Sequence, residues 1–379
     1  MREIPKSALS FQESQPARPS GLLSWLHIDL PLLTSLLMLA ACGLVVLYSA
    51  GDQDISLVQR QLIRLGIGFL VMTLLAQIHP DHLKRWSPLL YLTGLLMLAA
   101  VMLFGEEGKG AQRWLDLGLV RFQPSEMFKV SLPMMIAWFL ADKRLPPTLS
   151  RLLVAGLLIR VPVLLIAKQP DLGTALLVAS AGAFTLFLAG ISWILIVIVG
   201  LIMAALGPLA WIFMHDYQRQ RVLTFLNPES DPLGTGYHII QSKIAIGSGG
   251  IGGKGWLNGT QSHLEFLPER HTDFIFAVIS EEFGLVGVVA LLSLYLFIIL
   301  RGLYIATQAQ DTYSRILAGS LSMIFFVYLF VNAGMVSGLL PVVGVPLPLI
   351  SYGGTSLVTI LISFGILMSI HTHRKLLPT

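Results

Sequence analysis

Long apolar runs, separated by short polar breaks or by Pro and Gly, recur along almost the whole chain. The runs lie near 28–50, 57–78, 87–104, 125–141, 152–168, 172–190, 191–214, 273–300, 313–337 and 351–370. An α-helix needs about 20 apolar residues to cross the hydrocarbon core of a bilayer. The pattern therefore predicts an all-α integral membrane protein with about ten transmembrane helices.

Composition excludes a water-soluble globule. Of the 379 residues, 55% are hydrophobic and 12% are charged, whereas an ordinary soluble domain has about 25% charged residues. Apolar runs continue to the C-terminal end, which excludes a single anchor carrying a soluble domain. The one cysteine, Cys42, allows neither an internal disulfide nor a thiolate metal cluster.

The polar segments divide the chain into three regions. Residues 1–26 are polar and lack the apolar core and cleavage site of a signal peptide, so we expect a cytoplasmic tail. Residues 27–371 form a single membrane domain, and 372–379 form a second cytoplasmic tail. Within the domain, 215–272 is too polar and Gly-rich to span, which predicts a long extracytoplasmic loop between the seventh and eighth helices.

The basic residues indicate the orientation. The loops 79–86, 142–151 and 301–314 each carry Lys or Arg, as cytoplasmic loops do. About half of the 25 Lys and Arg fall on the opposite face: Arg60, Arg64, Lys109, Arg113, Arg121, Lys129, Arg160, Lys168, Arg219, Arg221, Lys243, Lys254 and Arg270. Either these residues escape the topology rule and snorkel, or they hold an anionic ligand at the outer surface, since isolated cations at hydrocarbon depth need a partner.

The first polar cluster occupies 109–129. Pro124, followed by Ser125 and Glu126, marks a helix start, which places Lys129 one turn into the membrane. Trp114 fits an interfacial aromatic belt as well as a binding site. The density of polar groups favours a site for a lipid head group, with these candidates: Arg113, Trp114, Arg121, Gln123 and Lys129.

The second cluster, 168–174, is a tight turn between two spans. The Asp171 carboxylate can cap the following helix and face the positive end of its dipole. It could equally pair with a basic residue such as Lys129 and orient it.

The third cluster is the 215–272 segment, with Arg219 and Arg221 as candidate substrate-binding residues. Residues 237–250 are amphipathic enough to lie along the membrane surface. The glycines of 247–255 lack the pattern of a phosphate-binding loop, and we interpret them as flexible.

Asp273 stands where this segment enters an apolar run. Thr272 or Asp273 could be the N-cap of that helix. Alternatively, Asp273 is a carboxylate placed at the membrane surface to accept a proton from a sugar hydroxyl. Glu281 and Glu282 lie deeper, and we expect structural polar contacts for them inside the bundle.

The last cluster, 332–356, is uncharged and rich in Pro and Gly. Such a segment at membrane depth predicts a non-helical or re-entrant loop, tolerated where protein or a cavity covers it. It either lines a pocket wall or is a rigid connection.

These polar stretches resemble, in the same order, the SEDS family of cell-wall polymerases. The resemblance runs from about residue 25 to residue 375. It is carried by KGAQRWLDLGLVRFQPSE (109–126), QPDLGT (169–174), 215–221, GYHIIQSKIAIGSGG (236–250), 255–273 with its LPERHTDFIFA ending, and GVPLPLISYGG (344–354).

The resemblance implies a peptidoglycan glycosyltransferase of cell elongation. Such an enzyme polymerises lipid II and undecaprenyl-pyrophosphate-linked glycan at the outer face of the bacterial cytoplasmic membrane, beside a class B penicillin-binding protein of the penicillin-binding protein 2 type. The family's essential aspartate falls on Asp273, and Trp114, Lys129 and Asp171 are among the positions it needs. Basic side chains, alone or with a divalent cation, would stabilise the leaving pyrophosphate. We expect membrane lipids and no nucleic acid as further partners.

Two other functions stay open: a transporter that flips the same lipid and a non-catalytic scaffold. A transporter should carry ionisable residues along a path through the bundle, whereas here Lys and Arg gather at the two faces. A scaffold leaves Asp273 and the Lys129 region without a role.

Overall fold

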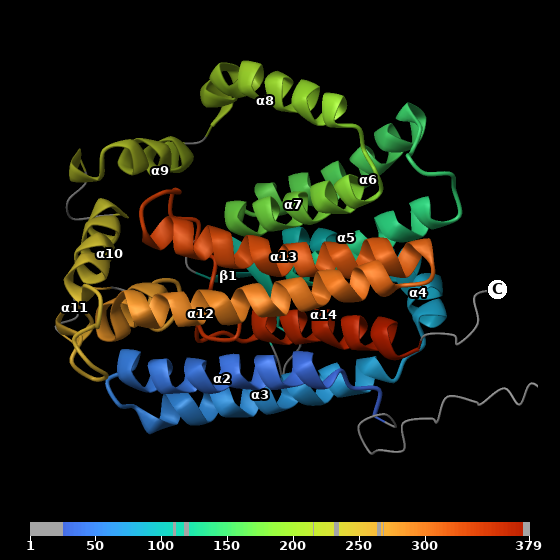
Figure 1. Cartoon of the computed structure of the whole chain (residues 1–379). Helices are drawn as coiled ribbons and strands as arrows, with labels where there is room; N and C mark the ends of the chain where they lie inside the picture. Colours follow the sequence, from blue (N-terminus) through green and yellow to red (C-terminus); the bar gives the residue numbers. More distant parts are fainter. Residues whose placement is uncertain are drawn as a thin grey trace, which may run out of the picture.

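The structure is a computed structural model that describes residues 26–108, 111–116, 121–214, 216–230, 235–263, 267 and 269–373. Most of both predicted tails lies outside these residues. Ten long helices in the described part confirm the all-α prediction (Figure 1): α2 (Leu30–Ala50), α3 (Ile55–Ala76), α4 (Pro80–Phe104), α5 (Pro124–Ala141), α6 (Leu149–Lys168), α7 (Leu172–Leu188), α8 (Trp193–Phe213), α12 (Ile275–Gln308), α13 (Thr312–Val336) and α14 (Thr355–Thr372). Of the described helices, seven are long and apolar enough to cross a membrane.

Local capping explains where several of these helices begin. The Asp29 carboxylate accepts a hydrogen bond from Leu32 N at the start of α2, at 2.9 Å. Asp311 does the same for Ser314 N at the start of α13. Such side chains satisfy backbone N–H groups that have no partner within the helix.

Helix α12 runs eight residues beyond the predicted span, and Arg301, the first residue of this extension, has a buried partner. Its guanidinium lies 2.6 Å from the Asp29 carboxylate, which is only 2% exposed as a side chain. The ion pair compensates a charge at the point where the apolar run stops.

The core lies where α13 packs against α5, α7 and α12, with α14 against α3 and α2 against α12. The described residues of α13 are largely buried. By contrast, α8 lies at the margin of the molecule (Figure 1), and most of its described side chains are exposed. Exposed apolar helices of this kind suit a lipid environment.

The region expected to be a loop before α5 contains a small antiparallel sheet of three strands, in the order β1-β2-β3: β1 (Glu106–Gly108), β2 (Ala111–Asp116) and β3 (Arg121–Phe122). Opposite Trp114 in the register lies Glu106. The pairing carries β2 and its side chains back towards the first turn of α5.

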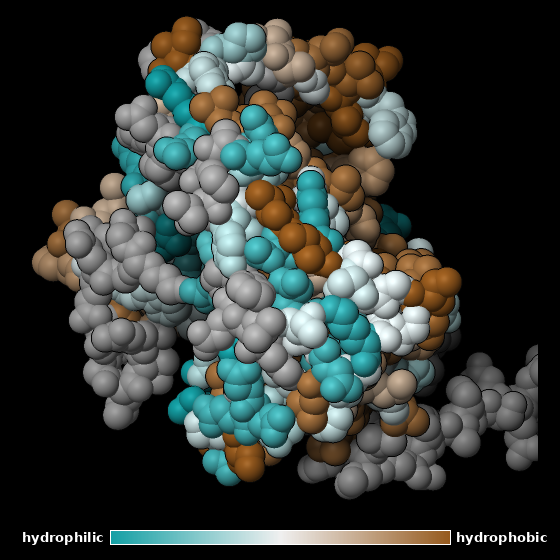
Figure 2. Space-filling model, turned by 90° about the vertical axis from the view of Figure 1, so that its left-hand side faces the viewer, coloured by the Kyte–Doolittle hydropathy of each residue, from teal (hydrophilic) through white to brown (hydrophobic). Residues whose placement is uncertain are grey.

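The 215–272 segment is largely helical. It contains α9 (Asp216–Leu226), a 3-10 turn (Pro228–Ser230), α10 (Thr235–Gly249) and the short α11 (Thr260–His263). Helix α10 packs against α12 and lies across one end of the bundle (Figure 1), which we call the loop end. Seen from this end, hydrophilic residues gather across the middle of the surface and hydrophobic residues along its margins (Figure 2).

Two glycines of 247–255 pack closely against α12 and the segment is hydrogen-bonded to that helix, so the interpretation that these glycines confer flexibility is wrong. A Cβ at Gly249 or Gly253 would overlap backbone atoms of α12. At Gly284 (φ 63°, ψ −161°), α12 leaves helical geometry. The freed carbonyls of Glu281 and Glu282 accept from the N–H groups of residues 254 and 255, at 3.0 and 2.9 Å, and the N–H groups of residues 285 and 286 donate to the carbonyls of 250 and 251. The glycine segment therefore repairs a break in a membrane helix.

The predicted non-helical loop lies between α13 and α14. Residues 341–347 have no regular structure, and α14 begins well inside the bundle (Figure 1). Protein covers the loop: Leu347 and Ile350 are buried, and the Tyr295 hydroxyl donates to the Pro348 carbonyl at 2.6 Å.

Candidate functional site

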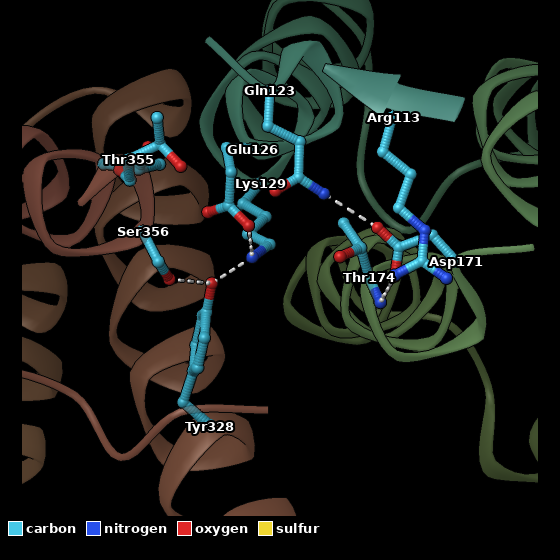
Figure 3. Close-up of polar contacts among 10 residues, drawn as sticks. Arg113, Gln123, Glu126, Lys129, Asp171, Thr174, Tyr328, Thr355 and Ser356 are labelled. Atoms are coloured by element: carbon cyan, nitrogen blue, oxygen red, sulfur yellow. Dashed lines mark hydrogen bonds and ion pairs between the residues drawn. The ribbon is translucent and has the colours of Figure 1, made fainter. Parts of the chain in front are cut away.

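A polar cluster joins the first turns of α5 and α7 (Figure 3). Gln123, at the N-cap of α5, donates from Nε2 to Asp171 Oδ2 at 2.8 Å. The other oxygen, Asp171 Oδ1, accepts from Thr174 N at 3.2 Å. The predicted capping role of Asp171 is therefore confirmed, and its second oxygen ties α7 to α5.

Arg113 enters this cluster from β2. Its Nη1 lies 4.0 Å from Asp171 Oδ1, and the guanidinium also donates to the carbonyls of Gln169 and Pro170. Its side chain is 30% exposed, so a positive charge remains accessible there. The structure thus brings together three of the predicted residues: Arg113, Gln123 and Asp171.

Lys129 lies deeper on α5 and is 3% exposed. Its Nζ is 2.5 Å from Glu126 Oε1, donates to the Tyr328 hydroxyl and lies 4.7 Å from the centre of the Tyr328 ring. The Tyr328 hydroxyl is in turn 3.2 Å from Ser356 Oγ (Figure 3). The alternative that Asp171 pairs with a basic residue also holds, but that residue is Arg113. Lys129, the example named in that alternative, pairs instead with Glu126, one turn away on the same helix.

Glu126, Tyr328 and Ser356 are site residues that sequence reasoning missed. The spacing of three between Glu126 and Lys129 was a usable signal for an ion pair within one helix. Tyr328 and Ser356 come from α13 and the start of α14, and nothing in their local sequence indicates that they meet Lys129.

Asp273 lies in a turn just before α12. The N-cap position is taken by Phe274, without a side-chain cap, so the capping alternative for Thr272 or Asp273 is wrong. The Asp273 carbonyl accepts from Asn332 Nδ2 at 2.9 Å. Its carboxylate lies beside Gly344, where a Cβ would be 3.4 Å from Asp273 Oδ2.

The 343–345 part of the α13–α14 loop links this turn to the Asp171 cluster. A Cβ at Gly173 would lie 2.5 Å from the Val343 carbonyl oxygen. Asn332 Nδ2 also donates to the Val345 carbonyl, at 2.8 Å. The first turn of α7 and the turn before α12 therefore contact the same short stretch of loop.

The other predicted residues are distributed differently. Arg219 donates to the carbonyls of Trp211 and Ile212 at the end of α8, at 3.0 and 2.7 Å. Trp114 is half-buried on β2. The side chains of Arg121 and Arg221 lie outside the described part of the structure.

The expected contacts of the acidic pair on α12 are present. Glu281 Oε1 accepts from Lys254 Nζ at 2.7 Å and from Gln261 N at 3.0 Å, and Glu282 accepts from the Ser49 hydroxyl.

Among the described residues, no group of three or more His, Cys, Asp or Glu is placed to hold a metal ion.

Fold and site together define a multi-pass helical membrane protein with polar side chains buried towards the loop end of its bundle. The sequence model of the family FTSW_RODA_SPOVE, described as "Cell cycle protein", matches residues 22–376. The chain belongs to this family.

Curated relatives match over nearly their whole length and carry an enzyme name. The chain is 57% identical over 352 residues to "Peptidoglycan glycosyltransferase MrdB" of Escherichia coli K12, covering 93% of this chain and 95% of that protein. It is 31% identical to "Peptidoglycan glycosyltransferase RodA" of Treponema pallidum, covering 91% and 98%.

Solved structures share the fold. The crystal structure of the rod shape determining protein RodA from Thermus thermophilus matches with a TM-score of 0.70 and 31% identity, covering 93% of this chain and 99% of that one. A chain from a structure titled "Structural coordination of polymerization and crosslinking by a peptidoglycan synthase complex" matches with a TM-score of 0.80 and 34% identity, covering 90% and 97%.

Proposed function

We propose that this protein is a peptidoglycan glycosyltransferase that polymerises lipid II into glycan strands, with Asp273 as the general base. One observation carries the proposal. The Asp273 carboxylate lies beside Gly344, on the same stretch of loop that contacts the Asp171 cluster with its accessible Arg113. The likeness to proteins named peptidoglycan glycosyltransferase supports the reaction class.

In the proposed reaction, Asp273 accepts the proton of the acceptor sugar's 4-hydroxyl. The oxygen attacks the anomeric carbon of the lipid-linked donor strand, a new glycosidic bond forms, and the bond from that carbon to the pyrophosphate breaks. Undecaprenyl pyrophosphate leaves with the electron pair, and the proton on Asp273 passes to solvent. A positioned base typically contributes about 10²–10⁴-fold to the rate.

The surroundings of Asp273 suit this role. The side chain is half-buried, so it remains reachable by a substrate. It also lies just before the first turn of α12, where the helix dipole favours an ionised carboxylate. Gly344 has φ 73°, a conformation that disfavours other residues, and a longer side chain there would cover the carboxylate.

The basic side chains provide the remaining chemistry. Arg113 keeps an accessible guanidinium near the start of α7, and a guanidinium can bind pyrophosphate oxygens through two parallel hydrogen bonds. This charge stabilises the leaving group as negative charge develops on it. Lys129, buried against Glu126, positions the first turn of α5 beneath this site.

The proposal includes a location and a partner. The protein lies in the inner membrane with its loop end facing the periplasm. On that side of the membrane, lipid-linked precursors present their head groups. A class B penicillin-binding protein cross-links the strands during cell elongation. The likeness to a chain from a peptidoglycan synthase complex supports such a partner.

Asp273→Asn tests the base assignment. The amide keeps the size of the side chain and removes the proton acceptor, so polymerisation of purified lipid II should fall at least about 10²-fold. Thermal stability in detergent and binding of the penicillin-binding partner should be unchanged. A variant that polymerises within a few-fold of the parent at neutral pH would show that another group is the base.

A further inference from the structure

The turn that carries Asp273, residues 269–274, is held by hydrogen bonds from outside its own helix. Helix α12 begins directly after this turn and has no side-chain cap. The carbonyls of residues 271, 272 and 273 point away from α12, and each accepts a hydrogen bond from α13 or from the loop before α14. Their donors, in the same order, are Tyr352 N at 2.8 Å, Ser351 Oγ at 2.5 Å and Asn332 Nδ2 at 2.9 Å.

Asn332 differs from the other two donors because it also bonds the loop stretch 343–345. Its Nδ2 donates to the Asp273 carbonyl at 2.9 Å and to the Val345 carbonyl at 2.8 Å. The side chain comes from α13 and is 0% exposed. One buried nitrogen therefore joins the turn with the proposed base to the loop stretch that contacts the first turn of α7 at Gly173.

The chemistry of the two neighbours determines how this amide is oriented. Both are backbone carbonyls, which can only accept a hydrogen bond, so the NH₂ group must face them. An Asn side chain offers two N–H donors on one nitrogen. A carboxylate of the same shape offers none, and a hydroxyl offers one. A short side chain that holds both carbonyls at once thus has to be an amide.

The other half of the amide gains nothing from this position. Asn332 Oδ1 is buried and finds no hydrogen-bond partner in the part of the chain that the structure describes. A buried acceptor without a partner costs free energy. What Asn332 contributes is therefore confined to Nδ2, which fixes the two carbonyls relative to each other.

The separation of these two segments matters for glycosyl transfer. The base must reach the acceptor hydroxyl while the leaving pyrophosphate is bound on the Arg113 side. The Asp273 carboxylate lies beside Gly344, within the same loop stretch that Asn332 holds. A misplacement of about 1 Å can cost about 10²-fold in rate.

We propose that Asn332 is a positioning residue, which sets the place of the Asp273 carboxylate relative to the Arg113 side of the site. It acts through the backbone of the turn and does not contact substrate. This inference rests on the proposed function, because it takes Asp273 as the base.

Asn332→Leu removes both donors at a similar side-chain size, and two measurements follow its effect. Hydrogen exchange of the full-length protein in nanodiscs should become about tenfold faster or more in peptides covering 269–275 and 343–352, because both segments lose a tether. In lipid II polymerisation, kcat should fall about tenfold or more while KM stays within about threefold, because substrates still bind and the base is displaced.

Leu321→Ala is the matched control for a general loss of stability. Leu321 is buried on the same helix, about three turns before Asn332. Its truncation should lower the melting temperature through lost packing. Exchange in 269–275 and kcat per folded molecule should stay at the parental values, because the two carbonyl bonds are intact.

Asn332→Gln covers the case in which Asn332→Leu does not accumulate in the membrane. It keeps both N–H donors on a side chain that is one methylene longer, so the bonds re-form only if the turn moves. The protein should fold, bind lipid II as the parent does and lose kcat about tenfold. A parental kcat in Asn332→Gln would overturn the positioning role.

Parental exchange of 269–275 in Asn332→Leu would also overturn it, as would faster exchange with an unchanged kcat. So would a loss that lies entirely in KM, or an equal change in Leu321→Ala. Asp273→Asn separates this inference from the proposed function, since it should fail to polymerise and keep the parental exchange in 343–352. If Asp273→Asn polymerises normally, the base assignment fails, and exchange in Asn332→Leu still decides whether Asn332 holds the turn.

Discussion

Charged side chains inside the bundle depend on partners within hydrogen-bonding distance. Lys129 and Glu126 are both almost fully buried and 2.5 Å apart. Glu126 Oε2 has no hydrogen-bond partner among the described residues. Removing one member of a buried pair leaves an uncompensated charge, whose cost is typically about 3–5 kcal/mol. Loss of activity in a single variant would therefore mix stability with function.

A double variant separates these effects. Lys129→Met should lower the thermal unfolding temperature and abolish polymerisation, because Glu126 is left buried and unpaired. Adding Glu126→Gln should recover most of the stability, since no buried charge remains, while lipid-substrate binding and polymerisation stay impaired. Unfolding in detergent and lipid II polymerisation are measured on the same preparations.

Recovery of the parental polymerisation rate in the double variant would contradict a functional role for Lys129. It would show that the Lys129–Glu126 pair is a structural element that uncharged side chains can replace.

At the scale of elements, helix α12 is broken and repaired within the membrane. The break at Gly284 frees backbone groups that the 250–255 segment satisfies. Backbone groups left unsatisfied in lipid would each cost several kcal/mol. The glycine segment and the first turns of α12 therefore form one unit, which supports the turn that carries Asp273.

Gly253→Ala tests this unit. Gly253 has φ 76°, and a Cβ there would overlap the Glu282 backbone. The substitution should destabilise the protein by about 1–3 kcal/mol from backbone strain, with a further contribution from the overlap. Gly252→Ala is the matched control, because a Cβ at Gly252 meets no atom within 4 Å. Thermal unfolding of both variants is compared, and equal melting temperatures would refute the packing role.

At the scale of the whole molecule, orientation follows from the basic loops. The 309–311 connection between α12 and α13, with the basic helix ends beside it, should face the cytoplasm, and 215–272 should face the periplasm. Asn258 and Gln310 are exposed residues in these two regions. In a Cys42→Ser background, Asn258→Cys should react with an impermeant thiol reagent in intact spheroplasts, and Gln310→Cys only after lysis. The reverse pattern would invert the topology and exclude a periplasmic site.

Hydropathy and capping chemistry by themselves determined the membrane class and the positions of the spans. The ten long helices lie at the predicted runs because a span needs about 20 apolar residues and a bilayer leaves few alternatives to a helix. The cap at Asp171 was also predictable, since a carboxylate bonds to N–H groups two or three residues ahead. Interactions over such short separations are encoded locally.

The tertiary structure decided which distant polar groups meet. Tyr328 and Ser356 reach Lys129 because α13 and the start of α14 pack beside α5. Gly249 and Gly253 contact α12 closely, although their local sequence suggested flexibility. Residues 351–352 bond to the turn before Asp273 only because this segment returns into the bundle, far in the chain from residues 271–272. Such contacts join residues far apart in the chain, and their geometry depends on the packing of whole helices, which local sequence patterns do not specify.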